Sequence, residues 1–108
     1  MNDAPAFSLS YIININGKIV GAMPDDEEFS AQEISDFVAG APETLCETPD
    51  GFVLIHNKNG RQNGLPINQV ATALHFSWAH QQVNILGRVF LGHPDHIPAH
   101  SKRRSATA

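Results

Sequence analysis

Cysteine is nearly absent from this sequence of 108 residues, which contains Cys46 alone. A single thiol cannot form an internal disulfide. The class of small secreted domains stapled by disulfides is therefore excluded, and we expect a reducing, cytoplasmic location. Cys46 alternates with polar neighbours between Thr44 and Glu47. This pattern indicates a buried thiol on a strand more than a nucleophile.

Long apolar runs are also missing, and so are the short motifs of common enzymes. The longest apolar stretches fall far below the roughly 20 residues needed to cross a bilayer, so we expect no membrane span. The start of the chain lacks the basic and apolar regions of a signal peptide. No G-x-S-x-G elbow and no glycine-rich loop ending in Gly-Lys-Ser/Thr is present. We therefore expect no catalytic residue and no cofactor.

Basic residues are scarce in the first half of the chain. The first 50 residues contain ten Asp or Glu and only Lys18, whereas the rest contains Asp95 and six Lys or Arg. Such a charge dipole can steer a charged partner or favour head-to-tail association. Alternatively, the acidic run 25–28 and the basic run 102–104 simply solvate a loop and a tail. Because the basic run is short and the rest is acidic, the sequence argues against specific nucleic-acid binding.

A first hairpin is indicated near the N-terminus. Apolar residues alternate with polar ones over residues 7–15, which is the period of a β-strand. Asn16-Gly17 follows, and both residues tolerate the positive φ of a two-residue hairpin turn. Residues 18–22 then return as a second strand. With this turn, Ile13 would face Val20 across the hairpin.

The start of a first helix is well specified. Ser30 stands at the N-cap position, and Glu33 completes a capping box three residues later. Phe29 and Ile34 occupy the two positions of a hydrophobic staple. Gly40 predicts the end of the helix. The stripe expected to be buried consists of Ile34, Phe37 and Val38.

The second half of the chain predicts a hairpin, a helix and a last strand. The hairpin spans residues 43–56, with Pro49-Asp50-Gly51 as its turn. Asn68 can cap the helix that follows. The last strand covers residues 83–91, and Gly87 within it suggests a bulge or a close backbone approach. The apolar face of the second helix comprises Ile67, Val70, Ala71, Leu74 and Trp78.

The element order ββ-α-ββ-α-β predicts one α+β domain over residues 7–92. We expect a mostly antiparallel sheet of four or five strands with both helices on one face. Residues 52–55 are all apolar, which fits a central strand covered on at least one side. The other face would be solvated or would bind something, for instance a second copy in a homo-oligomer. Residues 93–108 indicate an extended or disordered tail rich in histidine and basic residues.

The histidines of this tail raise the question of a metal site. His93, His96 and His100 would share one face of a helix, but Pro94 and Pro98 oppose such a helix. The clear Cys/His pairs of tight structural zinc sites are missing. We therefore expect no functional metal site.

The polar loop before the second helix is the strongest candidate for a ligand site. Helix N-termini and glycine-rich turns present free backbone N–H groups to anions, including phosphate. The guanidinium of Arg61 can clamp a phosphate or carboxylate through two hydrogen bonds. In the alternative interpretation, asparagine caps the helix and glycine supplies positive φ, with no ligand at all. The candidate ligand-binding residues are Asn57, Asn59, Arg61, Asn63 and Asn68.

Two aromatic residues near the end of the second helix are candidates for binding a partner. Trp78 continues the apolar stripe of this helix, whereas Phe76 falls off it. An exposed Phe76 would be suited to anchor a partner, because aromatic side chains dominate the energetics of many interfaces. For Trp78, the alternative is a place in the core.

Five segments carry a family resemblance. They are residues 37–40, 52–57, 59–68, 71–72 and 85–91. Together these segments resemble an uncharacterised family of small proteins, described only as a domain of unknown function and found mostly in phages, plasmids and integrated elements. The resemblance covers about residues 10–92. It implies a mobile-element origin and a compact α+β fold, and it implies no catalytic residue.

The leading functional hypothesis is a non-enzymatic binding protein that inhibits or sequesters a host factor. The habitat that the resemblance implies makes counter-defence in the cytoplasm of a bacterial host a reasonable form of this function. One mechanism blocks a host protein through an open sheet face, the acidic first half or Phe76. The other binds a phosphorylated small molecule at the polar loop, between copies of a homo-oligomer.

Two alternatives remain open at this point. A small enzyme acting on a nucleotide would need His56 or His75 as a general base beside Arg61. A structural module without its own ligand would respond to Arg61→Ala and Asn68→Ala by changes in stability only.

Overall fold

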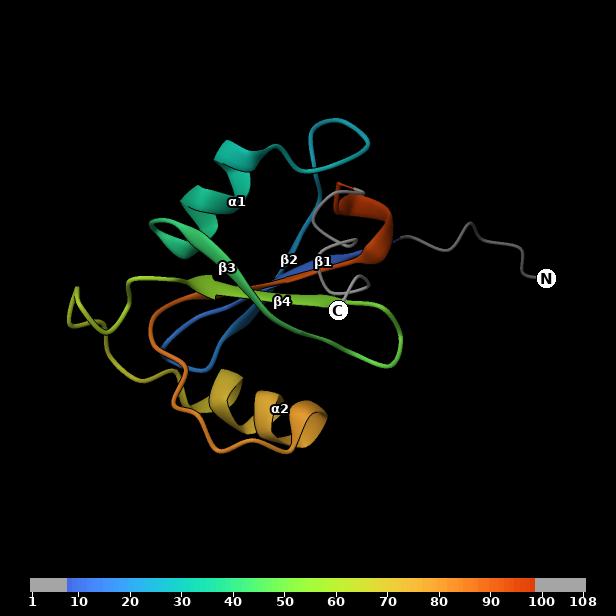
Figure 1. Ribbon diagram of the computed structural model, residues 1–108. Helices are drawn as coiled ribbons and strands as arrows, with labels where there is room; N and C mark the ends of the chain where they lie inside the picture. The colour runs from blue at the N-terminus through green and yellow to red at the C-terminus, as the bar shows by residue number, and fades with distance from the viewer. Residues whose placement is uncertain (1–7, 99–108) are drawn as a thin grey trace.

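The computed structural model describes residues 8–98, which form one five-stranded sheet in the order β2-β1-β5-β4-β3 (Figure 1). Every pair of neighbouring strands is antiparallel, which confirms the predicted α+β class. The last strand, β5, lies at the centre of the sheet between the two hairpins. The elements are β1 (Ser10–Ile13), β2 (Ile19–Ala22), α1 (Ala31–Val38), β3 (Pro42–Glu47), β4 (Val53–Asn57), α2 (Gln69–Ala79), β5 (Val89–Gly92) and the 3-10 helix η1 (Pro94–His96).

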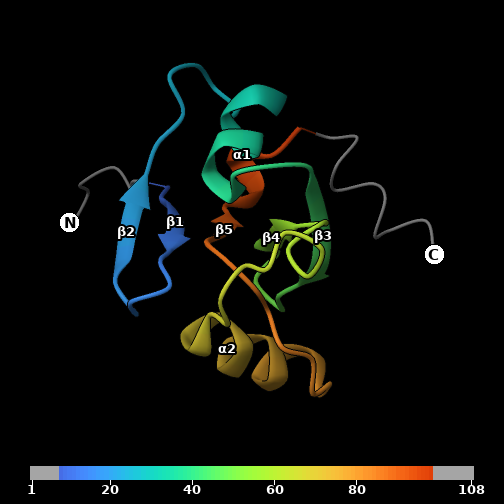
Figure 2. The same cartoon turned by 90° about the vertical axis from the view of Figure 1, so that its left-hand side faces the viewer.

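The two helices cover opposite faces of the sheet (Figures 1 and 2). Val53 and Ile55 of β4 share a core with α1, while Leu54 between them shares a core with α2. The expectation of both helices on one face is therefore wrong. Consecutive strand residues point to opposite faces, so a central strand that is apolar at every position is covered on both sides. Among residues 8–98, neither helix is long and apolar enough to cross a membrane.

Each face of the sheet carries its own hydrophobic core. On the α1 side, the ring of Phe29 packs edge-to-face against those of Phe37 and Phe90, with centroids 5.3 and 5.0 Å apart. Burial of one such ring contributes about 1.5–3 kcal/mol. The buried residues of the α1 core are Phe29, Ile34, Val38, Val53, Ile55, Phe90 and Ile97. Those of the α2 core are Ile13, Leu54, Ala71, Ile85 and Val89.

Helix α1 begins where its sequence predicts. The Ser30 Oγ accepts a hydrogen bond from the Glu33 N–H (3.1 Å), and the Glu33 carboxylate accepts one from the Ser30 N–H (2.8 Å). These two bonds are the predicted capping box. At the other end Ala39 adopts the left-handed conformation (φ 59°), and the Gly40 N–H donates to the Ser35 carbonyl (3.0 Å).

The first hairpin forms, but its register differs by one residue from the expected one. Ile13 pairs with Ile19 and not with Val20. The Gly17 N–H donates to the Asn14 carbonyl (2.9 Å), and Gly17 has φ 92°. The connection is thus a β-turn that ends in a left-handed glycine, which adds one residue to the loop. An Asn-Gly pair is compatible with both kinds of turn, so the sequence did not distinguish them.

The second hairpin follows its prediction, with a turn at Pro49-Asp50-Gly51 between β3 and β4. The Gly51 N–H donates to the Thr48 carbonyl (2.9 Å) and closes this turn. A register shift between Thr44 and Cys46 marks a bulge in β3. Cys46 is half-buried, and burial raises the pKa of its thiol. A raised thiol pKa fits a structural cysteine, because a nucleophile needs the thiolate.

Only the end of the expected last strand is a strand. β5 begins at Val89, whereas residues 81–88 return from α2 to the sheet with only one isolated bridge. Gly87 accounts for the difference: it has φ 82°, and a Cβ at this position would lie 2.7 Å from Leu65 Cδ1. The predicted close approach at this glycine is therefore present. It bends the chain where the sequence pattern alone indicated a continuous strand.

Residues 93–98 pack onto the fold, where an extended tail was expected. Ile97 is completely buried in the α1 core. The Phe29 N–H donates to the His96 carbonyl (2.9 Å), and the two rings meet edge-to-face at 5.6 Å. The expectation of an extended tail is therefore not met over residues 93–98, because Ile97, the backbone bond to Phe29 and the side chain of Ser10 hold this short segment on the fold. Residues 99–108 lie outside the described part of the chain.

Candidate functional site

Asn57, the first residue of the predicted ligand site, is engaged inside the protein. Its side chain is 1% exposed, and Nδ2 donates to the carbonyls of Val38 (3.2 Å) and Ala39 (3.1 Å). Its Oδ1 accepts from the Asn59 N–H (2.7 Å). This amide therefore satisfies the backbone at the end of α1, and it is not available to a ligand.

Asn68, at the other end of the loop, is engaged in the same way. It is completely buried, and its Nδ2 donates to the carbonyls of Ile13 and Gly87, each at 2.9 Å. Its Oδ1 accepts from the Ala71 N–H (3.0 Å), which is the predicted N-cap of α2. Asn68 thus ties β1, α2 and the segment before β5 together.

The backbone of the loop between these two residues is closed on itself. The Asn63 N–H donates to the Asn59 carbonyl (2.9 Å), and the Leu65 N–H donates to the Gly60 carbonyl (3.0 Å). Asn59 is half-buried, whereas Arg61 and Asn63 are exposed. Of the five predicted ligand-binding residues, the structure leaves two, Arg61 and Asn63, exposed.

Phe76, predicted as a partner anchor, lies at the surface on α2. It is 46% exposed, and Val83 beside the same hollow is 42% exposed. This hollow, called here the α2 hollow, runs between the outer side of α2 and the segment that follows it, and its volume is about 580 Å³. It is lined by Gln69, Thr72, Ala73, Phe76, Gln82, Val83 and Asn84.

Trp78, the second predicted partner residue, is half-buried and packs against the α2 core. Part of it also lines a smaller hollow of about 330 Å³. Tyr11 and Phe52, which also line this hollow, stack with ring centroids 6.4 Å apart. The full lining is Tyr11, Thr48, Pro49, Asp50, Phe52, Trp78 and Leu91. The core interpretation of Trp78 is therefore confirmed in part, and its role in binding a partner stays a prediction.

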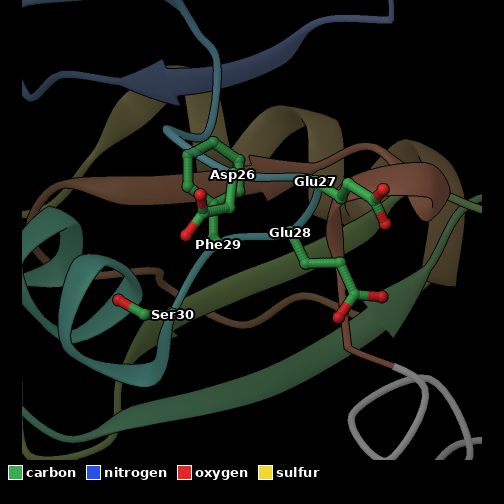
Figure 3. A pocket seen from close by; sticks show the side chains of 5 residues that line it. All are labelled: Asp26, Glu27, Glu28, Phe29 and Ser30. Atoms are coloured by element: carbon green, nitrogen blue, oxygen red, sulfur yellow. The ribbon is translucent and has the colours of Figure 1, made fainter.

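A third hollow, open and acidic, precedes α1 (Figure 3). Its volume is about 720 Å³, and it is lined by Asp26, Glu27, Glu28, Phe29 and Ser30. The carboxylate of Asp26 points away from those of Glu27 and Glu28, so the three do not converge (Figure 3). Over residues 8–98 no group of three or more His, Cys, Asp or Glu side chains is placed to hold a metal ion. His100 lies outside that range.

The two histidines of the enzyme hypothesis are placed on elements that bury or engage them. The His56 Nε2 lies 2.8 Å from a carboxylate oxygen of Glu43 on the neighbouring strand. His75 is 2% exposed on α2, and its Nδ1 has no hydrogen-bond partner within the described residues. Neither position therefore presents an unengaged imidazole at the surface.

A buried polar cluster at the end of the sheet was not foreseen. The Ser10 Oγ is completely buried, accepts from the His93 N–H and lies 2.8 Å from the His96 Nδ1. Burial and the neighbouring His93 lower the pKa of His96, partly offset by Asp95. Because Ser10 lies inside β1 with no exposed surface, this pair holds η1 in place and does not present a nucleophile.

Exposed apolar side chains on and beside the first hairpin were also missed. Ile19 and Met23 are each 53% exposed and Val20 is 49% exposed, while Ile15 and Leu9 are exposed to 43% and 36%. One signal was present, since residues 19–23 contain no charged or polar side chain on either face of the predicted strand. The lack of alternation there was a sign of unusual exposure or of burial on both faces.

Three surface features therefore stand out among residues 8–98: the α2 hollow beside Phe76, the aromatic hollow beside Trp78, and the apolar edge at β2. The predicted polar loop is mainly structural at its two ends, Asn57 and Asn68. Comparison of the chain with protein-family models, curated proteins and solved structures found no match.

Proposed function

We propose that this chain is a non-enzymatic binding protein that recognises a partner protein through the α2 hollow, with Phe76 as the anchor. The observation that supports this most directly is the pair of half-exposed side chains, Phe76 and Val83, on one hollow. Around them Gln69, Gln82 and Asn84 supply a polar rim. An apolar centre within a polar rim is the usual anatomy of a protein interface.

The walls of this hollow are held in place before any partner binds. The Asn68 side chain caps the start of α2, and the Ile85 N–H donates to the Thr72 Oγ1 (2.9 Å). This second bond fixes the segment after α2 against the helix. A preformed surface pays less conformational entropy on association, which favours affinity.

The target is proposed to be a host factor that the protein blocks or sequesters by occupancy. The family resemblance supports this, because it implies a phage or plasmid origin, and a small mobile-element protein without catalytic machinery commonly works by occupancy, of which counter-defence is a reasonable form. A partner contact centred on one aromatic anchor contributes about 2 kcal/mol or more to the free energy of binding. Burial of the Phe76 ring would supply an effect of this size.

The test uses a photo-crosslinking amino acid placed at Phe76 or, as a control, at the exposed neighbour Ser77. In host lysate we expect a specific crosslinked species from position 76 alone. For the protein identified in that species, Phe76→Ala should weaken binding at least tenfold, which corresponds to about 1.4 kcal/mol. Ser77→Ala should leave binding unchanged. Equal crosslinking from both positions, or unchanged binding by Phe76→Ala, would overturn the proposal.

Sequestration of a phosphorylated small molecule at the polar loop has less support. Asn57 and Asn68 bond the backbone, so of the five predicted ligand-binding residues only Arg61 and Asn63 have exposed side chains. Arg61→Ala separates the two mechanisms, because it removes the phosphate clamp and leaves the α2 hollow intact. Retained partner binding in this variant favours protein recognition through Phe76.

A further inference from the structure

Strand β2 forms one edge of the sheet, away from both helices (Figure 2). Over the described residues it pairs with β1 alone. The Asn14 N–H donates to the Lys18 carbonyl (2.9 Å). This bond determines which residues of β2 direct their backbone groups toward β1 and which direct them away. Val20 then directs its N–H and C=O toward β1, and Ile19 and Gly21 direct theirs outward. These outward groups can accept another strand.

The two edges of the sheet differ in how they are protected. The edge at β3 carries Pro42, Glu43 and Glu47, all exposed, and a bulge, which are the devices that prevent strands from pairing. The edge at β2 has no charge, no proline and no bulge within Ile19–Ala22. Its register with β1 is continuous. Of the two edges, β2 is therefore the one suited to pairing.

Side chains on both faces of β2 are apolar and exposed. Val20 lies opposite Ile12 on the α1 face, and Ile19 lies opposite Ile13 on the α2 face. Each is about half exposed, at 49% and 53%. A strand added beside β2 would cover both side chains at once, whichever face they occupy. This distinguishes an edge partner from one that docks on a single face.

We propose that β2 pairs antiparallel with β2 of a second copy of this chain, which joins the two sheets into one across a twofold axis. Charge identifies the occupant. With the axis through Gly21, the outward backbone groups of the two strands meet, and Lys18 of each copy lies opposite Pro24 of the other, next to Asp25. Lys18 is the single basic residue in the first half of the chain, and Asp25 begins its acidic run. A parallel arrangement would bring the two acidic runs together and is disfavoured.

This inference is independent of the proposed function, since the α2 hollow and β2 share no residue. It is tested by sedimentation velocity of the full chain over a wide concentration range. We expect a species of twice the 11.7 kDa chain mass. The protein would remain at the single-chain mass at every concentration if the edge instead serves another protein's strand or none, and this result overturns the proposal.

A matched pair of substitutions at Gly21 locates the interface. Gly21→Pro removes an outward N–H and leaves the bonds to β1 in place, so we expect at least a tenfold weaker dimer. Gly21→Ala keeps the N–H, and its Cβ would meet only Leu9 at an ordinary 3.7 Å, so the dimer should persist. A dimer that is equally strong in both variants overturns the assignment to β2.

Charge reversal provides a second route that does not touch the backbone. Lys18→Glu should weaken the dimer, and the double variant Lys18→Glu with Asp25→Lys should restore it, because both side chains are exposed. This comparison decides the question even if Gly21→Pro fails to fold. If the dissociation constant of the dimer is the same in Lys18→Glu, in the double variant and in the unchanged protein, the antiparallel arrangement is wrong.

Discussion

At the scale of single residues, the amide of Asn68 joins three parts of the chain. We expect Asn68→Ala to lower the free energy of unfolding by about 3 kcal/mol. Two buried carbonyls, those of Ile13 and Gly87, lose their donor, and α2 loses its N-cap. Urea unfolding followed by circular dichroism measures the change.

The control for this substitution is Asn63→Ala. Asn63 lies in the same loop but is exposed, so its removal should change the free energy of unfolding by less than about 0.5 kcal/mol. If the two variants had equal stability, the amide of Asn68 would not have the structural role described above.

A substitution at His75 is expected to raise the free energy of unfolding. Its ring is 2% exposed, and its Nδ1 lacks a hydrogen-bond partner in the described part of the chain. A buried polar group without a partner costs about 1–3 kcal/mol. We therefore expect His75→Leu, which has a similar volume, to raise the free energy of unfolding by about 1 kcal/mol.

The same urea experiment measures this gain, and Ser77→Leu at an exposed position of the same helix serves as its control. That control should have little effect on stability. A loss of stability in His75→Leu would show that the imidazole makes an interaction that an apolar side chain cannot replace.

Chemistry at single residues was predictable only where it acts locally. The capping roles of Ser30 and Asn68 depend on residues three positions away, and both were predicted. The remaining bonds of Asn57 and Asn68 reach carbonyls 19 and 55 residues distant. An amide that binds a ligand and one that satisfies a remote carbonyl have the same sequence signature, so the predicted site included two structural residues.

At the scale of elements, η1 depends on the protonation state of His96. The Ser10 Oγ accepts from the His93 N–H, so its own proton is free for the His96 Nδ1, which suits a neutral imidazole. Ser10, Phe29, His93 and Asp95 are the groups that contact or act on His96. Burial and His93 lower the pKa of this imidazole despite Asp95, so the folded state favours the neutral ring.

The sign of the pH dependence follows from this lowered pKa. Above the ordinary histidine pKa of about 6.5 both states are neutral and the contribution to stability is complete. As the pH falls below that value, the unfolded chain takes up a proton before the folded one does, so stability is lost until the folded pKa is passed. We expect a melting temperature that falls as the pH is lowered from 7 to 5.

His96→Gln should flatten this dependence, because it removes the titrating ring, whereas His80→Gln at an exposed position should keep it. Melting temperatures at a series of pH values give the comparison. An equal slope in both variants would show that another group controls the loss of stability.

The positions of helices and strands along the chain were predicted better than the register and packing between them. Four of the five strands and both α-helices were expected close to where they occur, because capping, turn residues and periodicity are local, whereas only the end of the last strand was placed correctly. The register of the first hairpin was not, since Asn-Gly suits two loop lengths. The docking of η1 was missed as well, because it rests on Ile97, a single apolar residue between prolines.

At the scale of the whole molecule, the sheet is covered on both sides and open at its edges. The helices take opposite faces (Figures 1 and 2), so the central faces are not free for a partner as the sequence had suggested. What remains for recognition lies on the outside of α2 and along β2. This placement follows from the apolar run in β4, and the sequence contained that run without indicating which helix would cover which side.

The central position of β5 has a consequence for folding during translation. The two hairpins precede β5 in the chain and do not pair with each other directly, so only β5 between them joins them into one sheet. The ribosome must therefore release the chain through β5, residues 89–92, before the sheet can close. Until then, β1 and β4 each keep one edge of unpaired backbone, which can bind chaperones or the strands of neighbouring nascent chains.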